Sequence, residues 1–571
     1  MSTAQGKLAF SWRYGAVLVL FVLLAMTVVG RLLYLQIESQ GFLQDQGDRR
    51  VVRIEKIPAY RGIIEDRNGE PLAVSTPVKS IWANPKELID AQYAWGFLAE
   101  KTGYTEARLR DRILRNQNKQ FIYLRRHMNP SKAESILSLS IPGVYGVEEH
   151  RRYYPAGEVT SHLVGFSNID EEGQEGIELS FDQYLQGEAG KKRVIKDLRH
   201  RIIKDVGLIN APAPGSNITL SIDLRAQYLA YRELLSAVTE YKATSGSAVA
   251  IDIKTGEVLA LVNHPSYNPN NRTRKDVENF RNRAVTDVFE PGSTVKPFTV
   301  AAALESGKWQ VHSKLDTSPG YLRVGSKSIR DMANYGVIDL GKVIAKSSNV
   351  GASKLALSME SGALSAFFHR IGLGEATGVG FPGESVGMLP ARSHWRPIEV
   401  ATLSYGYGLS VTALQLAQAY AVLGSGGIKR QISLLKVDGD VKGERVLDET
   451  VANAVLHMME GVVDERGTAR KARVPGYRVA GKTGTVHKVS SNGYQDHQYL
   501  AMFAGVAPVE DPAIALVVVI DDPKGGVYYG GQVAAPVFSR VMAGLLRVKN
   551  IPPDKAVETL VGLPKPVPPN T

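Results

Sequence analysis

The sequence predicts a membrane-anchored protein of mixed α/β (α+β) class, with a smaller domain followed by a larger C-terminal domain. One uncharged apolar run near the N-terminus is long enough to span a bilayer. A Pro- and Gly-rich segment at 211–215 divides the rest of the chain. Beyond it, strand-like runs at both ends enclose a mainly helical middle, which implies an antiparallel sheet built from both ends of the domain and flanked by helices.

Composition limits the class of protein. The chain has 571 residues, of which 44% are hydrophobic, enough for packed cores. Its net charge of +11 suits an anionic partner, and without a long basic run or a nucleic-acid motif we expect a membrane surface or cell-wall polymer, not nucleic acid. The absence of cysteine excludes disulfides, thiol catalysis and Cys-ligated metal. We expect neither a metal nor a cofactor.

The run Tyr14–Gly30 holds 17 residues without a charge. As a helix it is about 26 Å long, against a hydrocarbon core of about 30 Å, and a flanking apolar stretch extends the predicted transmembrane helix to 14–35. A cleaved signal peptide is the alternative, but no small-residue cleavage site follows, which favours an uncleaved anchor. Lys7 and Arg13 precede the run, so residues 1–13 are expected in the cytoplasm and the rest outside it.

Residues 36–211 form the predicted non-catalytic domain. Val51–Ile57 alternates like a strand, and Glu106–Asn116 and Ser131–Leu139 have helical periodicity. We find no nucleophile with an adjacent base here. The segment Asp66–Gly69 is typical of a turn, and its neighbouring Arg and Asp residues are expected to form buried structural ion pairs.

The second domain is predicted to cover 212–549. A strand at Ile218–Asp223 opens it, a helical middle runs from Ser293 to about Leu423, and a final helix covers Val533–Leu546. The other predicted strands are Gly246–Ile253, Glu257–Asn263, Arg478–Val486, Tyr499–Ala507 and Ile514–Ile520. Residues 550–571 are Pro-rich and predicted to be a disordered tail.

A candidate nucleophile lies where a turn becomes a helix. Pro291 and Gly292 break the preceding structure, and Pro297 is tolerated only in a first helical turn, which sets the helix start close to Ser293. Residues three apart share a helix face, so Lys296 is expected beside the Ser293 hydroxyl. The helix N-terminus also favours negative charge, and together these activate a weak nucleophile.

The same short motifs recur elsewhere without this geometry. Ser433–Lys436 repeats S-x-x-K, but it lies in a predicted strand, where residues i and i+3 face opposite sides. Lys254–Gly256 repeats Lys-Thr-Gly as a predicted hairpin turn, and Lys101–Gly103 as a predicted helix C-cap.

The ordered set of motifs is more specific than any one of them. Ser293 with Lys296 is followed by Ser347 with Asn349, and then by Lys482-Thr483-Gly484. With this set the chain resembles the class B penicillin-binding proteins, most closely the division-specific transpeptidases of Gram-negative bacteria. Non-catalytic segments carry the resemblance too: Arg61–Gly69, Arg152–Gly157 and Gly173–Glu178. Ser348 replaces the usual Asp of the middle motif.

The resemblance implies a serine D,D-transpeptidase that crosslinks peptidoglycan during septal wall synthesis and is acylated by β-lactams. Ser293 would attack the carbonyl between the last two D-alanines of a stem peptide, and a neutral Lys296 would take its proton. Burial and the charge of Lys482 would lower the pKa of Lys296. An amine of a second stem peptide would then resolve the acyl-enzyme.

The remaining roles also come from the resemblance. Ser347 and Asn349 would relay the proton and hold the substrate amide, while the backbone N–H groups of Ser293 and Thr485 would form the oxyanion hole. Lys482, with Thr483 or Thr485, would bind the substrate carboxylate, and Gly484 would leave the strand edge bare for substrate pairing. Four tyrosines are either site walls or ordinary core aromatics: Tyr405, Tyr407, Tyr528 and Tyr529.

Alternatives remain open at this point. The elongation-specific class B transpeptidase is the closest, followed by a D,D-carboxypeptidase, a β-lactamase and a catalytically idle β-lactam sensor or scaffold. The resemblance implies a single-pass inner-membrane protein with a periplasmic catalytic domain. Its expected partners are peptidoglycan stem peptides, β-lactams, a SEDS-family glycosyltransferase and other division proteins. Small residues in the span, such as Gly15, Ala25 and Gly30, are of the kind that allow helix–helix contact in lipid, but the span has no clean small-x-x-x-small repeat, so a plain anchor stays an alternative.

Overall fold

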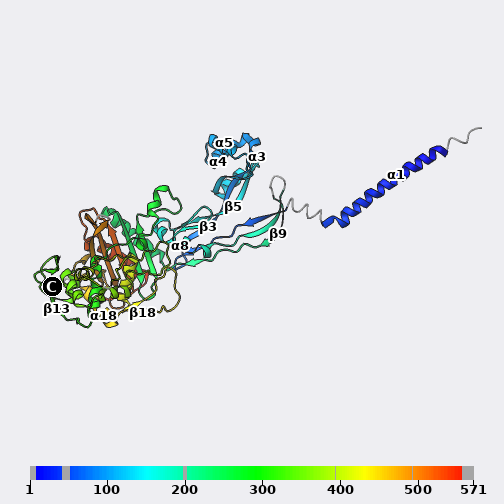
Figure 1. Cartoon of the computed structure of the whole chain (residues 1–571). Coiled ribbons are helices and arrows are strands. Elements are labelled where there is room, and N and C mark those ends of the chain that lie inside the picture. Colours follow the sequence, from blue (N-terminus) through cyan, green and yellow to red (C-terminus); the bar gives the residue numbers. More distant parts are fainter. Residues whose placement is uncertain (1–7, 42–51, 197–201, 393, 491–492, 556–571) are drawn as a thin grey trace, which may run out of the picture. The chain divides into compact units, whose positions relative to one another are not determined.

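The computed structural model describes residues 8–41, 52–196, 202–392, 394–490 and 493–555 (Figure 1). Residues 1–7 of the expected cytoplasmic segment and 556–571 of the expected tail lie outside this range. The chain forms two compact units. The first comprises residues 1–60, 77–149 and 187–214, and the second comprises 61–76, 150–186 and 215–571.

The N-terminal helix α1 (Leu8–Leu33) continues into a π-helical turn at Tyr34–Glu38 (Figure 1). The helical stretch that is long and apolar enough to cross a membrane is Trp12–Glu38. It therefore begins and ends slightly outside the predicted limits of 14–35. Within it the hydroxyl of Thr27 donates to the carbonyls one turn earlier, so the helix leaves that polar group satisfied in an apolar setting.

The first unit combines a three-stranded antiparallel sheet with a small helical domain. The sheet order is β1–β8–β9, from Val52–Ile57, Gly190–Lys196 and Ile202–Asn210. The helices are α3 (Pro85–Leu88), α4 (Trp95–Thr102), α5 (Glu106–Arg115) and α6 (Pro130–Leu137). With them lie strand β4 (Ile122–Met128) and those parts of β3 (Pro71–Ala83) and β5 (Val144–Tyr153) that fall within residues 77–149. The predicted strand at 51–57 is confirmed over 52–57, residue 51 lying outside the described residues, and both predicted helices are confirmed. Thr105 caps α5 by accepting from the N–H of Arg108, as its helix-start position predicts.

Two segments expected in the 36–211 domain, residues 61–76 and 150–186, group with the second unit instead. A buried ion cluster joins them: the Arg61 guanidinium lies 2.7 Å from Glu178 and 2.7 Å from Asp182, and Arg152 lies 2.6 Å from Glu178. The short elements here are β2 (Ile64–Glu65), α7 (Ser161–Val164), β6 (Phe166–Ser167), β7 (Gly173–Glu175), α8 (Gly176–Ser180) and α9 (Asp182–Leu185). Ion pairs in this region were expected, but the carboxylate partners come from distant positions.

The predicted turn at Asp66–Gly69 is confirmed and explains the grouping. Gly69 has φ +87°, and one Asp66 carboxylate oxygen accepts from the N–H groups of Asn68 and Glu70. The other oxygen accepts from the N–H of Leu224 at 2.9 Å, the first residue of α10 (Leu224–Glu240). This turn therefore caps a helix of the larger unit.

The second unit is organised by a five-stranded antiparallel sheet in the order β12–β11–β21–β20–β19. Its strands are β11 (Ser245–Asp252), β12 (Val258–His264), β19 (Ala480–Ser490), β20 (Gly493–Ala507) and β21 (Ile514–Asp521). The sheet predicted from both ends of the domain is thus confirmed, with β19 at its edge. The opening strand β10 is only Ile218–Thr219, shorter than the predicted Ile218–Asp223.

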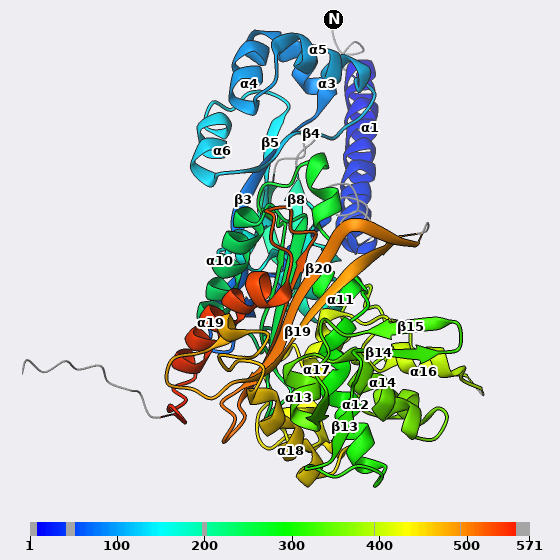
Figure 2. The same ribbon diagram turned by 90° about the vertical axis from the view of Figure 1, so that its left-hand side faces the viewer.

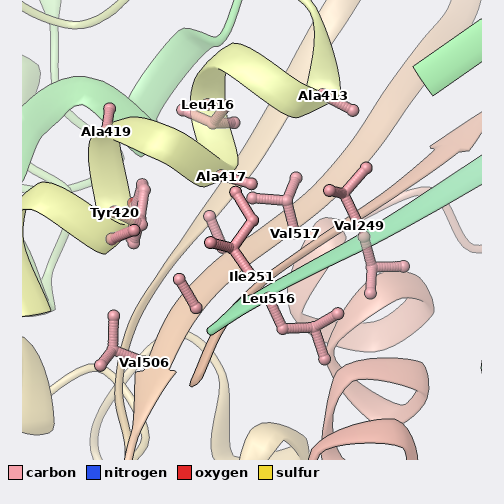
Figure 3. Packing of buried hydrophobic residues seen from close by; sticks show 14 of the residues in the cluster. Val249, Ile251, Ala413, Leu416, Ala417, Ala419, Tyr420, Val506, Leu516 and Val517 are labelled. Atoms are coloured by element: carbon pink, nitrogen blue, oxygen red, sulfur yellow. The ribbon is translucent and has the colours of Figure 1, made fainter. Parts of the chain in front are cut away.

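Helices cover the sheet (Figure 2). The helices α10 and α19 (Gly530–Val548) pack against each other and against strands of this sheet, and α17 (Ala413–Gly424) packs on β21, β11 and β20. Side chains alternate across the strands: Val517 points toward α17 with Val249, whereas its neighbour Leu516 points away from α17 (Figure 3). The sheet is therefore buried on both faces.

The middle of this unit is mainly helical, as predicted, with short hairpins that the sequence pattern did not predict. Its helices are α11 (Arg283–Thr286), α12 (Lys296–Glu305), α13 (Leu340–Ala345), α14 (Asn349–Ser358), α15 (Ala363–Arg370), α16 (Pro397–Leu403) and α18 (Glu449–Glu460). The short strands are β13 (Lys314–Asp316), β14 (Tyr321–Val324), β15 (Lys327–Arg330), β16 (Val337–Asp339), β17 (Ile428–Lys429) and β18 (Glu444–Arg445).

Candidate active site

Ser293 lies in a 3₁₀ turn, Gly292–Val295, that leads directly into α12. The predicted position at a helix start is therefore confirmed. Gly292 has φ +53°, and a Cβ there would lie 2.3 Å from the Cγ1 of Val486 in β19. The turn is thus pressed against the edge strand, and only glycine fits at that point.

Lys296 follows on the first turn of α12 and is fully buried. Its Nζ donates to the Ser347 carbonyl at 2.6 Å, to the Ser347 hydroxyl at 3.0 Å and to Asn349 Oδ1 at 2.7 Å. Ser347 has φ +57°, a left-handed conformation that costs a non-glycine residue free energy. Through this bend both its carbonyl and its hydroxyl reach the same amine, so the strain serves to position the side chains around Lys296.

The electrostatics of this amine suit a base. Burial lowers the pKa of Lys296 well below its ordinary value, the Lys482 charge adds to that effect, and Asp331 opposes it. Burial also lowers the pKa of Lys482, to about 7. A neutral Lys296 keeps a lone pair for a hydroxyl proton, and the Ser347 hydroxyl can rotate to donate to it.

Asp331 is a residue that the sequence reasoning did not single out. Its carboxylate accepts from the Ser348 hydroxyl at 2.5 Å and from the N–H groups of Asn349 and Val350 at 2.5 and 3.0 Å. The Ser348 hydroxyl in turn accepts from the N–H of Gly351 and caps α14. Ser348, which the sequence reasoning left without a role, therefore fixes the helix start between the two predicted site residues.

The Lys482-Thr483-Gly484 motif lies on β19. The Lys482 Nζ donates to the Thr483 carbonyl at 3.2 Å and to its hydroxyl at 3.3 Å, and the Thr485 hydroxyl accepts from the N–H of Gly530 at 3.0 Å. A Cβ on Gly484 would lie 3.2 Å from the carbonyl oxygen of Pro291. The structure thus gives a packing reason for glycine at position 484, because the turn that carries Ser293 passes close to it.

The four tyrosines form two separate groups. Tyr405 and Tyr407 flank Gly406, whose carbonyl accepts from the N–H of Gly292 at 3.0 Å, so their loop packs against the turn that carries Ser293. The ring centroids of Tyr405 and Tyr407 are 5.6 Å apart. Tyr528 and Tyr529 stack at 4.5 Å in the segment that precedes α19. The first pair lies in a loop beside the start of α12, and the second pair lies in a loop beside β19.

Glu290 is a second residue that the sequence reasoning did not place. It accepts from the N–H of Gly408 at 2.9 Å and from the hydroxyl of Tyr494 at 3.1 Å. Tyr494 belongs to β20 and lies 5.9 Å from the ring of Tyr407. Burial raises the pKa of Glu290. This carboxylate therefore ties the tyrosine loop and the β19–β20 hairpin to the segment that leads to Ser293.

The repeated motifs lie elsewhere and perform local structural tasks. Lys254–Gly256 is the turn between β11 and β12, and Gly103 at the end of α4 has φ +77°, so both predictions are confirmed. Ser433–Lys436 is not a full strand: Ser433 and Leu435 form isolated bridges, and the Ser433 hydroxyl donates to the carbonyl of Leu435. Each bridge joins only one residue of this segment to one residue elsewhere, and so short a pairing does not extend a sheet.

Comparison with known proteins identifies the family. Residues 246–543 match the family description "Penicillin binding protein transpeptidase domain", and residues 56–220 match "Penicillin-binding Protein dimerisation domain". Together these ranges cover most of the chain.

Individual relatives agree. The chain is 50% identical to the peptidoglycan D,D-transpeptidase FtsI of Escherichia coli K12 over 95% of this chain and 93% of the relative, and 40% identical to the probable transpeptidase PenA of Neisseria meningitidis serogroup B over 97% and 94%. Penicillin-binding protein 3 of Mycobacterium tuberculosis, solved with aztreonam, is 26% identical, covers 88% of this chain and 99% of its own, and has a TM-score of 0.68. The chain therefore belongs to the class B penicillin-binding proteins and, within them, to the FtsI-like peptidoglycan D,D-transpeptidases.

Proposed function

We propose that this protein crosslinks peptidoglycan stem peptides during septal wall synthesis, through an acyl-enzyme on Ser293. The observation that carries the proposal is the buried Lys296 amine, which sits one helical turn from Ser293 and is held by Ser347 and Asn349. A buried amine with a strongly lowered pKa has one evident use beside a serine hydroxyl at a helix start, which is to accept its proton.

The acylation step follows from these groups. The Ser293 oxygen attacks the carbonyl carbon between two terminal D-alanines, and its proton passes to the neutral Nζ of Lys296. The oxyanion is held by the N–H groups of Ser293 and Thr485, each such donor being worth about 10² to 10³ in rate. The C–N bond then breaks, the leaving nitrogen takes a proton through the Lys296–Ser347 pair, and D-alanine departs.

Deacylation reverses the proton path. The amine of a second stem peptide attacks the ester carbonyl of the acyl-enzyme, loses its proton to Lys296 and forms the crosslinking amide, while Ser293 regains its hydroxyl. Before acylation, protonated Lys482 and the Thr483 hydroxyl hold the donor's terminal carboxylate, which then leaves with D-alanine, and the edge of β19 pairs with the peptide backbone. Tyr405, Tyr407, Tyr528 and Tyr529 form the walls of the binding site.

β-Lactams enter the same path. Their strained amide presents a carbonyl to Ser293 and a carboxylate to Lys482, and after ring opening the leaving nitrogen stays tethered to the acyl group. The M. tuberculosis relative was solved with aztreonam, which supports β-lactam binding by this domain.

The membrane arrangement is part of the proposal. One helix is apolar enough to span a bilayer among the residues that the structure describes, which supports a single-pass anchor. Lys7 and Arg13 precede it, so the N-terminus lies in the cytoplasm and the catalytic unit in the periplasm. A SEDS-family glycosyltransferase that supplies the glycan strands is the proposed partner in the membrane.

Product analysis with the full-length protein tests the reaction. A donor ending in D-Ala-D-Ala is incubated with an acceptor amine, and released D-alanine is compared with crosslinked dimer by mass spectrometry. We expect dimer in step with D-alanine release. Release of D-alanine without dimer would identify a carboxypeptidase, and no release from a labelled, folded enzyme would identify a sensor. Localisation of a tagged copy at midcell, not along the side wall, tests the septal role.

A further inference from the structure

A cavity of about 360 Å³ lies in the larger unit, between the start of α17 and one end of the central sheet. Its floor comes from β11, β21, β20 and β19, and its roof comes from the segment Arg281–Phe289. The volume is within the range of small-molecule sites, about 300 to 1,000 Å³. None of the residues assigned to the reaction lines it.

The charges in this cavity do not balance. Three cationic side chains, Arg281, Arg283 and Lys488, line it with two carboxylates, Asp287 and Asp521. Lys488 pairs with Asp521 at 2.8 Å and Arg281 pairs with Asp287 at 3.0 Å. Arg283 is left with a distant contact, 3.9 Å from Asp287, so one positive charge lacks a close partner within the cavity.

Arg283 is also incompletely hydrogen-bonded. Its side chain is 12% exposed, and its Nη1 is buried without a hydrogen-bond partner among the residues that the structure describes. Its Nη2 makes only a long bond, 3.5 Å, to the carbonyl of Glu278. An unmatched guanidinium nitrogen is costly to bury, and an oxyanion is the ligand that the planar fork of a guanidinium group fits.

We propose that this cavity binds a small oxyanion, a carboxylate or phosphate group, with Arg283 as its main ligand and Arg281 and Lys488 beside it. Burial and the charge of Arg281 lower the pKa of Arg283, whereas Asp287 and Asp521 raise it, and a bound anion would act in the same direction as these two carboxylates. The carboxylates of Asp287 and Asp521 would repel further negative charge, so the expected ligand carries a single compact negative group.

The position of the cavity gives such a ligand influence over the active site. Lys488 lies on β19 three residues after Thr485, and Phe289 precedes Ser293 by four residues. A bound anion therefore contacts or adjoins the two segments, before Ser293 and after Thr485, that position the proposed nucleophile and the Lys482 motif. A ligand can shift the active site only if it binds one conformation of the site more tightly than another. Contacts to both segments give the anion that difference in affinity.

Binding is measured by calorimetry on the full-length protein in detergent, with sodium phosphate and sodium acetate as separate probes and sodium chloride at equal ionic strength as the blank. We expect saturable binding of at least one probe, and the preferred probe tells phosphate from carboxylate. Arg281→Gln and Lys488→Gln, on side chains more exposed than Arg283, should each weaken binding about tenfold.

Matched controls are Arg274→Gln and Lys275→Gln, exposed residues of the same charge outside the cavity, which should leave the dissociation constant unchanged. Failure of both probes to bind would overturn the site. So would binding that is lost in Lys482→Gln but kept in both cavity variants, because the anion would then occupy the substrate-carboxylate site.

Coupling is measured as the rate of Ser293 acylation by a fluorescent penicillin, with and without the bound probe. We expect at least a twofold change in the wild type and, at the same probe concentration, a smaller change in Lys488→Gln, because that variant binds the probe more weakly. An unchanged wild-type rate at saturating probe would overturn the coupling.

Discussion

The hydroxyl of Ser348 donates to the carboxylate of Asp331 at 2.5 Å, and the same carboxylate receives the first N–H groups of α14. This contact holds Ser347 and Asn349 in place on either side of Ser348. Asp331 also acts on the buried amine, because its charge raises the pKa of Lys296 against the effect of burial.

Asp331→Asn tests this positioning role. Loss of the charge should lower the pKa of Lys296 further, so the acidic limb of the acylation rate should move to lower pH. Weaker support of α14 should also reduce the maximal rate, by about ten- to a hundredfold. The pH profile is measured with a fluorescent penicillin. Asp339→Asn, at the N-cap of α13, removes an equivalent carboxylate elsewhere and should leave the profile unmoved, and a matching shift in that variant would contradict the role.

Ser293→Ala should abolish covalent labelling by penicillin, because the hydroxyl that forms the ester is gone. Ser433→Ala is the internal control, since Ser433 begins the repeated S-x-x-K motif in an extended segment, and it should label like the wild type. Labelling is read on a denaturing gel. Equal labelling of the two variants would disprove the assignment of the nucleophile.

The acylation rate should fall as the pH drops through the lowered pKa of Lys296. The sign follows from the chemistry: below that pKa the amine carries a proton and cannot accept another. Lys296→Arg should be inactive at every pH because arginine stays protonated. A flat rate between about pH 6 and 9, with activity retained in Lys296→Arg, would rule out Lys296 as the base.

Gly406→Ala should block acylation. A Cβ at this position would lie 1.9 Å from the carbonyl oxygen of Gly292, so the nucleophile's turn must move. Gly408→Ala is the matched control, because Gly408 has a similar positive φ, +79° against +88°, and nothing within 4 Å of its Cβ. Both variants share the backbone strain, about 1 to 3 kcal/mol. We expect near-normal acylation only in Gly408→Ala, and similar rates in the two would show that the contact is unimportant.

Replacing Tyr14 to Leu35 with an unrelated apolar helix of the same length and orientation should leave penicillin labelling intact. The same change should abolish complementation of septation in a depletion strain, because the native helix offers small residues such as Gly15, Ala25 and Gly30 for close contact in lipid. Full complementation by the exchanged helix would reduce the segment to a tether.

The sequence by itself determined the elements whose signals are local. The apolar run predicts α1, the helix-start pattern around Ser293 predicts the turn before α12, and the strand runs predict all five strands of the central sheet. These succeed because dihedral preference, capping and hydrophobic periodicity act over a few residues. The order of three short motifs added the family.

Only the tertiary structure decided which distant groups meet. Asp331 reaches Ser348 across 17 positions of chain, and Gly406 lies against Gly292 although more than a hundred residues separate them. The division into units also depended on such contacts, since Arg61 finds its carboxylate at Glu178 and Asp66 caps a helix at Leu224. Topology fixes these pairings, and no local periodicity encodes it. The same holds for the left-handed Ser347, whose strain is stable only because the surrounding packing holds it.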